Sequence, residues 1–225
     1  MAANSARRGT LRLLAALAAT PVASLLPRLA RAQDRGGRAR QDVDYRIIPA
    51  QPVPAGNVIE VVEFFWYGCP YCYQFEPHFA AWLGRQPAGV VARRVPAAFR
   101  ESWVPHARLY YTLEALGALE RLHQRVYESY HVEDMRLDGV DSIADWAASH
   151  GIDRERWLTV YRSDDVSQRV LQARDQLQRY TVSGTPSVVV DGRYLTSSGM
   201  TPGAAAMIPV LDSLVALVRE QRGSR

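Results

Sequence analysis

The chain has 225 residues, a hydrophobic fraction of 48% and a formal net charge of +4, which suits one globular domain or a domain with a large insertion. The positive excess lies near the N-terminus: residues 1–32 contain five arginines and no acidic residue, so removing their five charges from +4 leaves −1 for the remainder. Nucleic-acid binding requires a basic surface. We therefore exclude nucleic acid as a partner.

The first segment, residues 1–32, has the pattern of a cleaved export signal. Arg7 and Arg8 precede the apolar run "LLAALAATPVASLL", and "ARA" at 30–32 is a small-x-small cleavage pattern that predicts a mature chain beginning at Gln33. The run is short for a membrane span, although an uncut anchor remains the alternative. The export route stays open, because "SARRGTL" matches a twin-arginine signal only weakly.

The mature chain is expected to begin with a disordered arm, "QDRGGRARQ", at residues 33–41. Within residues 42–101, "VDYRIIP" predicts a short strand, and the apolar run 58–66 predicts a strand buried on both faces. Apolar residues then recur at helical spacing over residues 70–84. The segment "VVARRVPAA" from Val90 predicts a second strand, parallel to the first after a right-handed crossover.

Residues 102–179 have helical periodicity and no strand pattern, and predict an all-helical insert. Asp141 and Ser142 are expected to cap one helix, which stops at Gly151, and Asp153 is expected to cap the next.

The strand pattern returns in residues 180–221. The segment "SGTPSVVVDGRYLTS" predicts a β-hairpin with its turn at 191–192, and a final helix is predicted from Thr201 to Val218. The order β-α-β, helices, β-β-α predicts a discontinuous α/β domain, formed by residues 42–101 and 180–221, that the helical insert interrupts.

The chain has two cysteines, Cys69 and Cys72, at the end of the predicted buried strand. With Cys69 as the N-cap and Pro70 as the first helical residue, the two sulfurs come within bonding distance across the first helical turn. The N–H groups and the dipole at the helix start favour the Cys69 thiolate and lower its pKa. A stabilised thiolate favours the reduced pair, so the disulfide would oxidise other thiols. Cys72, on the inner side of the helix, is expected to resolve a mixed disulfide formed at Cys69.

Other uses of this cysteine pair fit less well. Zinc would need two more ligands, and the five histidines are scattered along the chain. Covalent haem would need His directly after Cys72, where Tyr73 stands. A structural disulfide closing so small a loop would gain little stability. The sequence therefore predicts redox chemistry with no metal and no cofactor.

The segment "EFFWYGCPYCYQFEP", followed by the helical region and "VSGTPSVVVDGRY", resembles the DsbA family of exported thiol:disulfide oxidoreductases. The resemblance implies a thioredoxin-like fold with an inserted all-helical domain, and an enzyme of the periplasm that introduces disulfide bonds into exported proteins. It places the nucleophilic cysteine on Cys69 and the resolving cysteine on Cys72. The implied partners are unfolded exported polypeptides with free thiols and a quinone-linked membrane oxidase of the DsbB type.

The resemblance also carries expectations for residues around the cysteines. Pro70 and Tyr71 stand where Pro-His is common in the family, so the Cys69 pKa is expected to be less depressed than in Pro-His members. Pro186 falls on the family's cis-proline. The preceding Thr185 would then lie beside the sulfurs, where its backbone can pair with an extended substrate.

Glu63 is an acidic residue inside the predicted buried strand, where a carboxylate is costly unless it is paired or neutral. The resemblance implies a role in proton handling at the active site, with Arg94 near the position of the family's usual lysine partner. The alternative is that Glu63 only makes a satisfied buried ion pair. Glu76, one helical turn after Cys72, is expected on a solvated face.

Two other functions stay open: a disulfide isomerase or reductase of the same fold, and a redox-inactive peptide-binding chaperone with a permanently closed disulfide. The dimeric isomerases of the family carry an N-terminal dimerisation domain. The roughly 25 residues between Gln33 and Val58 are too few to form one, so we expect a monomer.

Overall fold

The computed structural model describes residues 37–56, 58–86 and 88–223. The predicted export signal and residues 33–36 of the predicted arm lie outside the described residues. From Arg38 onward the described residues belong to one unit. None of the helices within these ranges is both long enough and apolar enough to span a bilayer.

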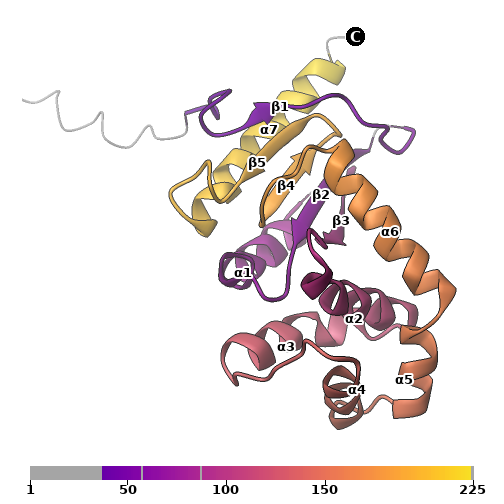
Figure 1. Cartoon of the computed structure of the whole chain (residues 1–225). Coiled ribbons are helices and arrows are strands. Elements are labelled where there is room, and N and C mark those ends of the chain that lie inside the picture. The colour runs from indigo at the N-terminus through magenta and orange to yellow at the C-terminus, as the bar shows by residue number, and fades with distance from the viewer. Residues whose placement is uncertain (1–36, 57, 87, 224–225) are drawn as a thin grey trace, which may run out of the picture. The chain divides into compact units, whose positions relative to one another are not determined.

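A five-stranded sheet with the order β1-β5-β4-β2-β3 lies at the centre of this unit (Figure 1). The central strand β2 (Ile59–Phe65) is buried along its whole length, as predicted, and pairs in parallel with β3 (Val90–Pro96). On its other side β2 pairs antiparallel with β4 (Ser187–Val190), which continues to β5 (Tyr194–Ser197) and the short edge strand β1 (Arg46–Ile47).

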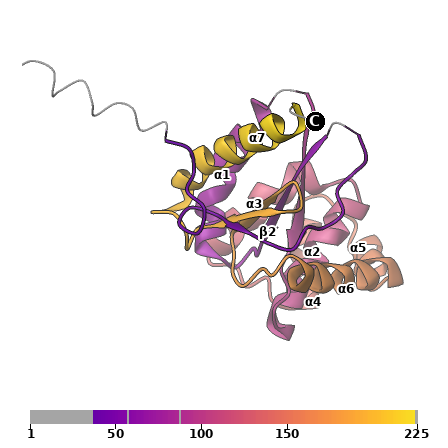
Figure 2. The same ribbon diagram turned by 90° about the horizontal axis from the view of Figure 1, so that it is seen from above.

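The described residues form seven α-helices. One of them, α1, connects β2 to β3, five make up the region between β3 and β4, and α7 follows β5. Seen from above, α1 and α7 lie on one side of the sheet, and α2 and α6 lie on the other (Figure 2). Their bounds are α1 (Pro70–Gly84), α2 (Val104–Ala115), α3 (Leu119–His131), α4 (Val140–Ser149), α5 (Arg154–Tyr161), α6 (Asp164–Arg179) and α7 (Met207–Gly223).

The predicted hairpin turn is present between β4 and β5. Asp191 and Gly192 have φ values of 54° and 64°, the left-handed conformation that a two-residue hairpin turn of this type requires. Glycine is also needed for space, because a Cβ at Gly192 would lie 2.5 Å from the Gln51 carbonyl oxygen. The turn therefore fixes the hairpin register and holds the segment before β2 against it.

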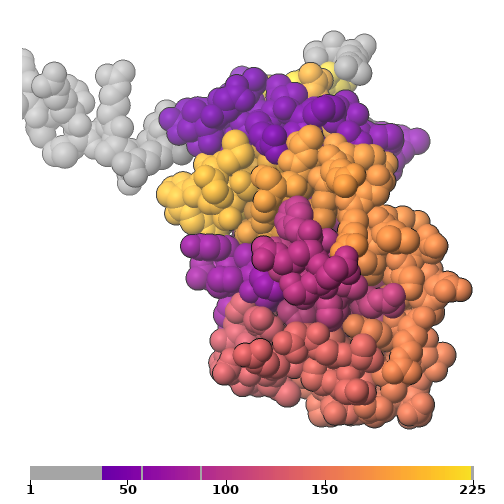
Figure 3. Space-filling view, viewed as in Figure 1, coloured from indigo at the N-terminus to yellow at the C-terminus, as the bar shows by residue number. Residues whose placement is uncertain are grey.

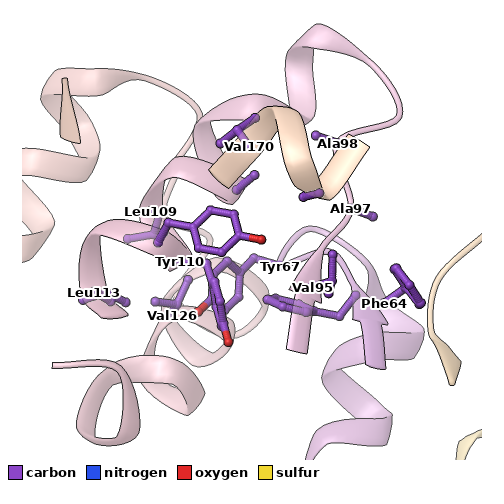
Figure 4. Close-up of a cluster of buried hydrophobic side chains, with 14 of the residues drawn as sticks. Phe64, Tyr67, Val95, Ala97, Ala98, Leu109, Tyr110, Leu113, Val126 and Val170 are labelled. Carbon is purple, nitrogen blue, oxygen red and sulfur yellow. The ribbon is translucent and has the colours of Figure 1, made fainter. Parts of the chain in front are cut away.

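Alternating residues of the central strands divide the interior into two hydrophobic cores. One face of the sheet packs against α1 and α7, and its contributors include Val61, Val188 and Val190. The opposite face packs against the insert, so one core crosses from the sheet into the helical region. Figure 4 shows this second core, with Phe64, Tyr67 and Val95 beside Leu109, Tyr110, Leu113, Val126 and Val170.

Two predicted helix starts are wrong. The N-cap of α4 is Gly139, and Ser142 is the third helical residue, where its hydroxyl accepts from the Gly139 N–H and donates to the Gly139 carbonyl. The last helix begins at Met207 instead of Thr201, because Gly203 has a φ of 109° that no α-helix can contain.

Residues 38–41, assigned from the sequence to a disordered arm, contact the folded unit. Arg38 forms an ion pair with Glu220 on α7, and Ala39 packs against the core beneath that helix. Gln41 forms an isolated β-bridge with Tyr45. Composition alone did not predict these contacts, because Glu220 is far from Arg38 in sequence and the Gln41–Tyr45 bridge lies outside the regular strands.

Candidate active site

Cys69 and Cys72 lie at the start of α1, directly beyond the carboxyl end of β2. Cys69 is the N-cap residue with extended backbone, Pro70 occupies the first helical position, and the Cys69 carbonyl accepts from the Cys72 N–H at 3.1 Å. Both cysteines are free thiols. Cys69 keeps 7% of its surface exposed and Cys72 none, while Tyr71 between them is 56% exposed. A partner thiol can therefore reach Cys69 but not Cys72.

The two thiols differ in their proton affinity. The pKa of Cys69 is lowered to about 6, above all by a hydrogen bond with the Cys72 thiol, with smaller contributions from Thr185 and from the backbone N–H groups of Cys72 and Tyr71. Burial raises the pKa of Cys72 well above its ordinary value. The direction for Cys69 agrees with the sequence-based expectation, but the largest cause is the neighbouring thiol and not the helix N-terminus.

A loop before β4 lies against the reactive sulfur. The Thr185–Pro186 peptide bond is cis, as the family resemblance implied. The Thr185 carbonyl oxygen lies 3.3 Å from the Cys69 Sγ. The loop is tied back on itself where the Ser187 hydroxyl donates to the Gly184 carbonyl at 2.8 Å. Segments more than a hundred residues apart in sequence thus meet at one sulfur atom.

Beneath the cysteines, one arginine contacts two buried carboxylates. Arg94 on β3 donates from Nε to Glu63 Oε2 at 3.0 Å and from Nη2 to Glu76 Oε1 at 2.6 Å. Glu63 is fully buried and Glu76 is 5% exposed, so the prediction that Glu76 lies on a solvated face is wrong. Its position explains the burial, because Glu76 follows Cys72 by four residues and shares the inward face of α1 with it.

Arg94 carries one positive charge and contacts two carboxyl groups, so it cannot neutralise both of them if both are ionised. The pKa of Glu63 is raised to about 8, first by burial and then by the charge of Glu76, while Arg94 opposes the rise. Glu63 is thus mostly protonated at neutral pH. The charge of Glu63 is also one of the causes that raise the Cys72 pKa, which places the Glu63 carboxyl within electrostatic reach of that thiol.

Two histidines of α3 contact tyrosines on either side of the cysteines, and neither was predicted from the sequence as a site residue. His123 Nδ1 lies 2.8 Å from the Tyr67 hydroxyl, and burial lowers the His123 pKa. His131 Nε2 lies 2.8 Å from the Tyr67 carbonyl, and its ring stacks on Tyr73. The sequence contains a pattern that predicts this arrangement: His123, Tyr127 and His131 are four residues apart, so both histidines lie on one face of α3.

Comparison with known proteins agrees with this architecture. The DSBA-like thioredoxin domain family matches residues 86–214. The thiol:disulfide interchange protein DsbA of Burkholderia cepacia is 38% identical over 182 residues, 80% of this chain and 85% of that protein. DsbA of Azotobacter vinelandii is 40% identical over 164 residues, 73% of this chain and 77% of that protein. The crystal structure of Pseudomonas aeruginosa DsbA superposes with a TM-score of 0.78 at 33% identity, and covers 82% of this chain and 97% of that one.

A thioredoxin-like sheet with a helical insert, together with these relatives, defines the class of protein as a thiol:disulfide oxidoreductase. Within that class the chain belongs to the DsbA family. The matched family domain begins after the two cysteines, so the roles of Cys69 and Cys72 rest on the geometry of this chain.

Proposed function

We propose that this protein is a periplasmic dithiol oxidase that donates a Cys69–Cys72 disulfide to newly exported polypeptides with free thiols. The observation that carries the proposal is the pairing of a reachable Cys69, whose pKa is about 6, with a buried Cys72 at the start of α1. The thioredoxin-like part, residues 42–101 and 180–221, supplies the redox site, and the insert, residues 102–179, covers it. The enzyme acts as a monomer, with no metal or cofactor.

In the proposed reaction, a substrate thiolate attacks the Cys69 sulfur of the oxidised protein. The Cys69–Cys72 bond breaks, a mixed disulfide forms at Cys69, and Cys72 leaves with the electron pair and takes up a proton. Protonated Glu63, whose charge affects the Cys72 pKa, is the proposed donor of this proton, and Arg94 then stabilises the resulting carboxylate. The raised pKa of Glu63 favours this functional role over a purely structural ion pair.

A second substrate thiolate then attacks the substrate sulfur of the mixed disulfide. The substrate disulfide forms and Cys69 leaves as a thiolate, which its low pKa stabilises. The backbone of Thr185 is proposed to hold the substrate as an added strand during both steps. Two electrons pass from the substrate to the protein, and a quinone-linked membrane oxidase of the DsbB type removes them.

The test is a peptide-oxidation assay run beside an insulin-reduction assay and the equilibrium with glutathione. We expect rapid oxidation of a dithiol peptide, loss of activity in Cys69→Ser, and a reduction potential well above the value of about −270 mV for thioredoxin. A potential near that of thioredoxin would point to a reductase instead. Peptide binding without any exchange in the wild-type protein would point to a chaperone.

A further inference from the structure

A pocket lies between the chain that follows β3 and the C-terminal half of α6. Its volume is about 490 Å³, and its lining includes Phe99 and Arg100 from one side and Leu177 and Val182 from the other. In the space-filling view, the magenta chain after β3 lies against the orange α6 on the face turned toward the viewer (Figure 3). The pocket therefore combines apolar side chains with a cationic rim.

The pocket is connected to the reactive sulfur through the loop before β4. Val182 precedes Thr185 by three residues, and the Thr185 carbonyl lies 3.3 Å from the Cys69 Sγ. Three extended residues span at most about 11 Å. A chain that pairs with the Thr185 backbone would thus bring a side chain three or four positions from its own cysteine to this pocket.

A row of stacked aromatic rings forms a second connection. The Trp66 ring lies so close to Gly68 that a Cβ there would be 2.3 Å from it, and Gly68 directly precedes Cys69. Trp66 stacks on Trp103 with ring centroids 3.9 Å apart, and Phe99 meets Trp103 edge-on at 5.5 Å. This aromatic row, Trp66, Trp103 and Phe99, runs from the cysteine motif to the pocket, where Phe99 is 39% exposed.

The charge at the pocket is unbalanced. The Arg100 guanidinium lies 5.2 Å from the centre of the Trp103 ring, and Arg100 forms no ion pair with a carboxylate in the described part of the chain. The other arginine of the lining, Arg174, is already paired with Glu101 and donates to the Ala98 carbonyl. Arg100 is therefore a cation held on an aromatic surface and available to an acidic group.

We propose that the pocket and the aromatic row bind the substrate polypeptide beside its reacting cysteine. An aliphatic or aromatic substrate side chain enters the pocket next to Phe99 and Leu177, and a neighbouring Asp or Glu pairs with Arg100. The inference rests on the proposed function, because it needs a thiol-bearing chain at Cys69. It adds a sequence preference to that function: apolar and acidic residues about three to five positions from the cysteine.

The test compares two dithiol peptides that differ only in Leu-Asp against Leu-Asn at that distance from the reacting cysteine. The measured quantity is the second-order rate constant for reduction of the Cys69–Cys72 disulfide by each peptide, divided by the constant for reduced glutathione. We expect the Asp peptide to react about two- to fivefold faster with the wild-type protein at low salt. Arg100→Glu should abolish that preference, and Phe99→Ala should lower the ratio about fivefold for both peptides.

Arg156→Glu is the matched control, because it makes the same charge change at an exposed position in the first turn of α5. It should keep the preference for the Asp peptide. Equal wild-type rates for the two peptides, with normal glutathione exchange, would overturn the docking proposal alone. The docking proposal would also be overturned if Arg100→Glu left the peptide rates unchanged but slowed reoxidation by quinone-containing membrane vesicles. The surface would then belong to the membrane oxidase. A disulfide that glutathione cannot reduce would overturn the proposed function itself.

Discussion

Replacing Cys72 with alanine should raise the pKa of Cys69, since the Cys72 thiol is the largest cause of its depression. The pKa falls from an ordinary 9.0 to about 6, which corresponds to about 4 kcal/mol of thiolate stabilisation at about 1.4 kcal/mol per unit. A hydrogen bond to a charged group contributes about 1.5–3 kcal/mol. Its loss should therefore bring the Cys69 pKa to between about 7 and 8.

The assay is a pH titration of thiolate absorbance in the ultraviolet, supported by the rate of alkylation at each pH. At pH 7 the thiolate fraction should fall from about nine-tenths to between about one-tenth and one-half. Cys72→Ser is the matched control, because its hydroxyl can still donate to the Cys69 sulfur and should keep the pKa closer to 6. An alanine variant that titrates like the serine variant would refute the reasoning, and would leave the backbone N–H groups of α1 as the main cause.

Three further changes test the surroundings of the cysteines. Tyr71→His should lower the Cys69 pKa by about half a unit to one unit, because an imidazolium beside the sulfur favours the thiolate; an unchanged titration curve, with Tyr71→Phe as the neutral comparison, would count against it. Glu63→Gln should slow peptide oxidation about tenfold and remove an inflection near pH 8 from its pH profile; an inflection that persists would exclude Glu63 as its source. Arg94→Met removes the cation that contacts the buried Glu76 carboxylate and the mostly protonated Glu63, and should lower the free energy of unfolding by about 3–5 kcal/mol at pH 7. Denaturant unfolding should find a smaller loss in acid, where the carboxyls take up protons, and an equal loss at both pH values would contradict this explanation.

Local chemistry made much of the fold predictable. The helix that begins at Pro70 and the hairpin turn at Asp191 follow from residues adjacent in sequence, and both are present in the structure. Asp153 caps α5 as predicted, with its side chain accepting from the Arg156 N–H at 2.8 Å. Such features depend on a few neighbouring residues and so can be derived from the sequence alone.

Features that depend on distant partners could not be derived in this way. Glu76 was expected in solvent because it is charged, but Arg94, 18 residues away, compensates its burial. The contact of α3 with the residues before Cys69 could not be predicted either, because His131 and its partner Tyr67 are 64 residues apart in sequence. The main cause of the lowered Cys69 pKa is a hydrogen bond from the Cys72 side chain. The spacing of the two cysteines alone does not show which thiol donates to the other.

The central claim is that the reduced protein holds Cys69 as a thiolate at neutral pH. The most direct test is the reduction potential measured against pH by equilibration with glutathione. Reduction should then consume one proton for two electrons, so the potential should fall by about 30 mV per pH unit between pH 6.5 and 7.5 and more steeply, toward about 59 mV, below pH 6. A slope near 59 mV that continues up to pH 8 would mean that Cys69 is protonated there, and would contradict the claim.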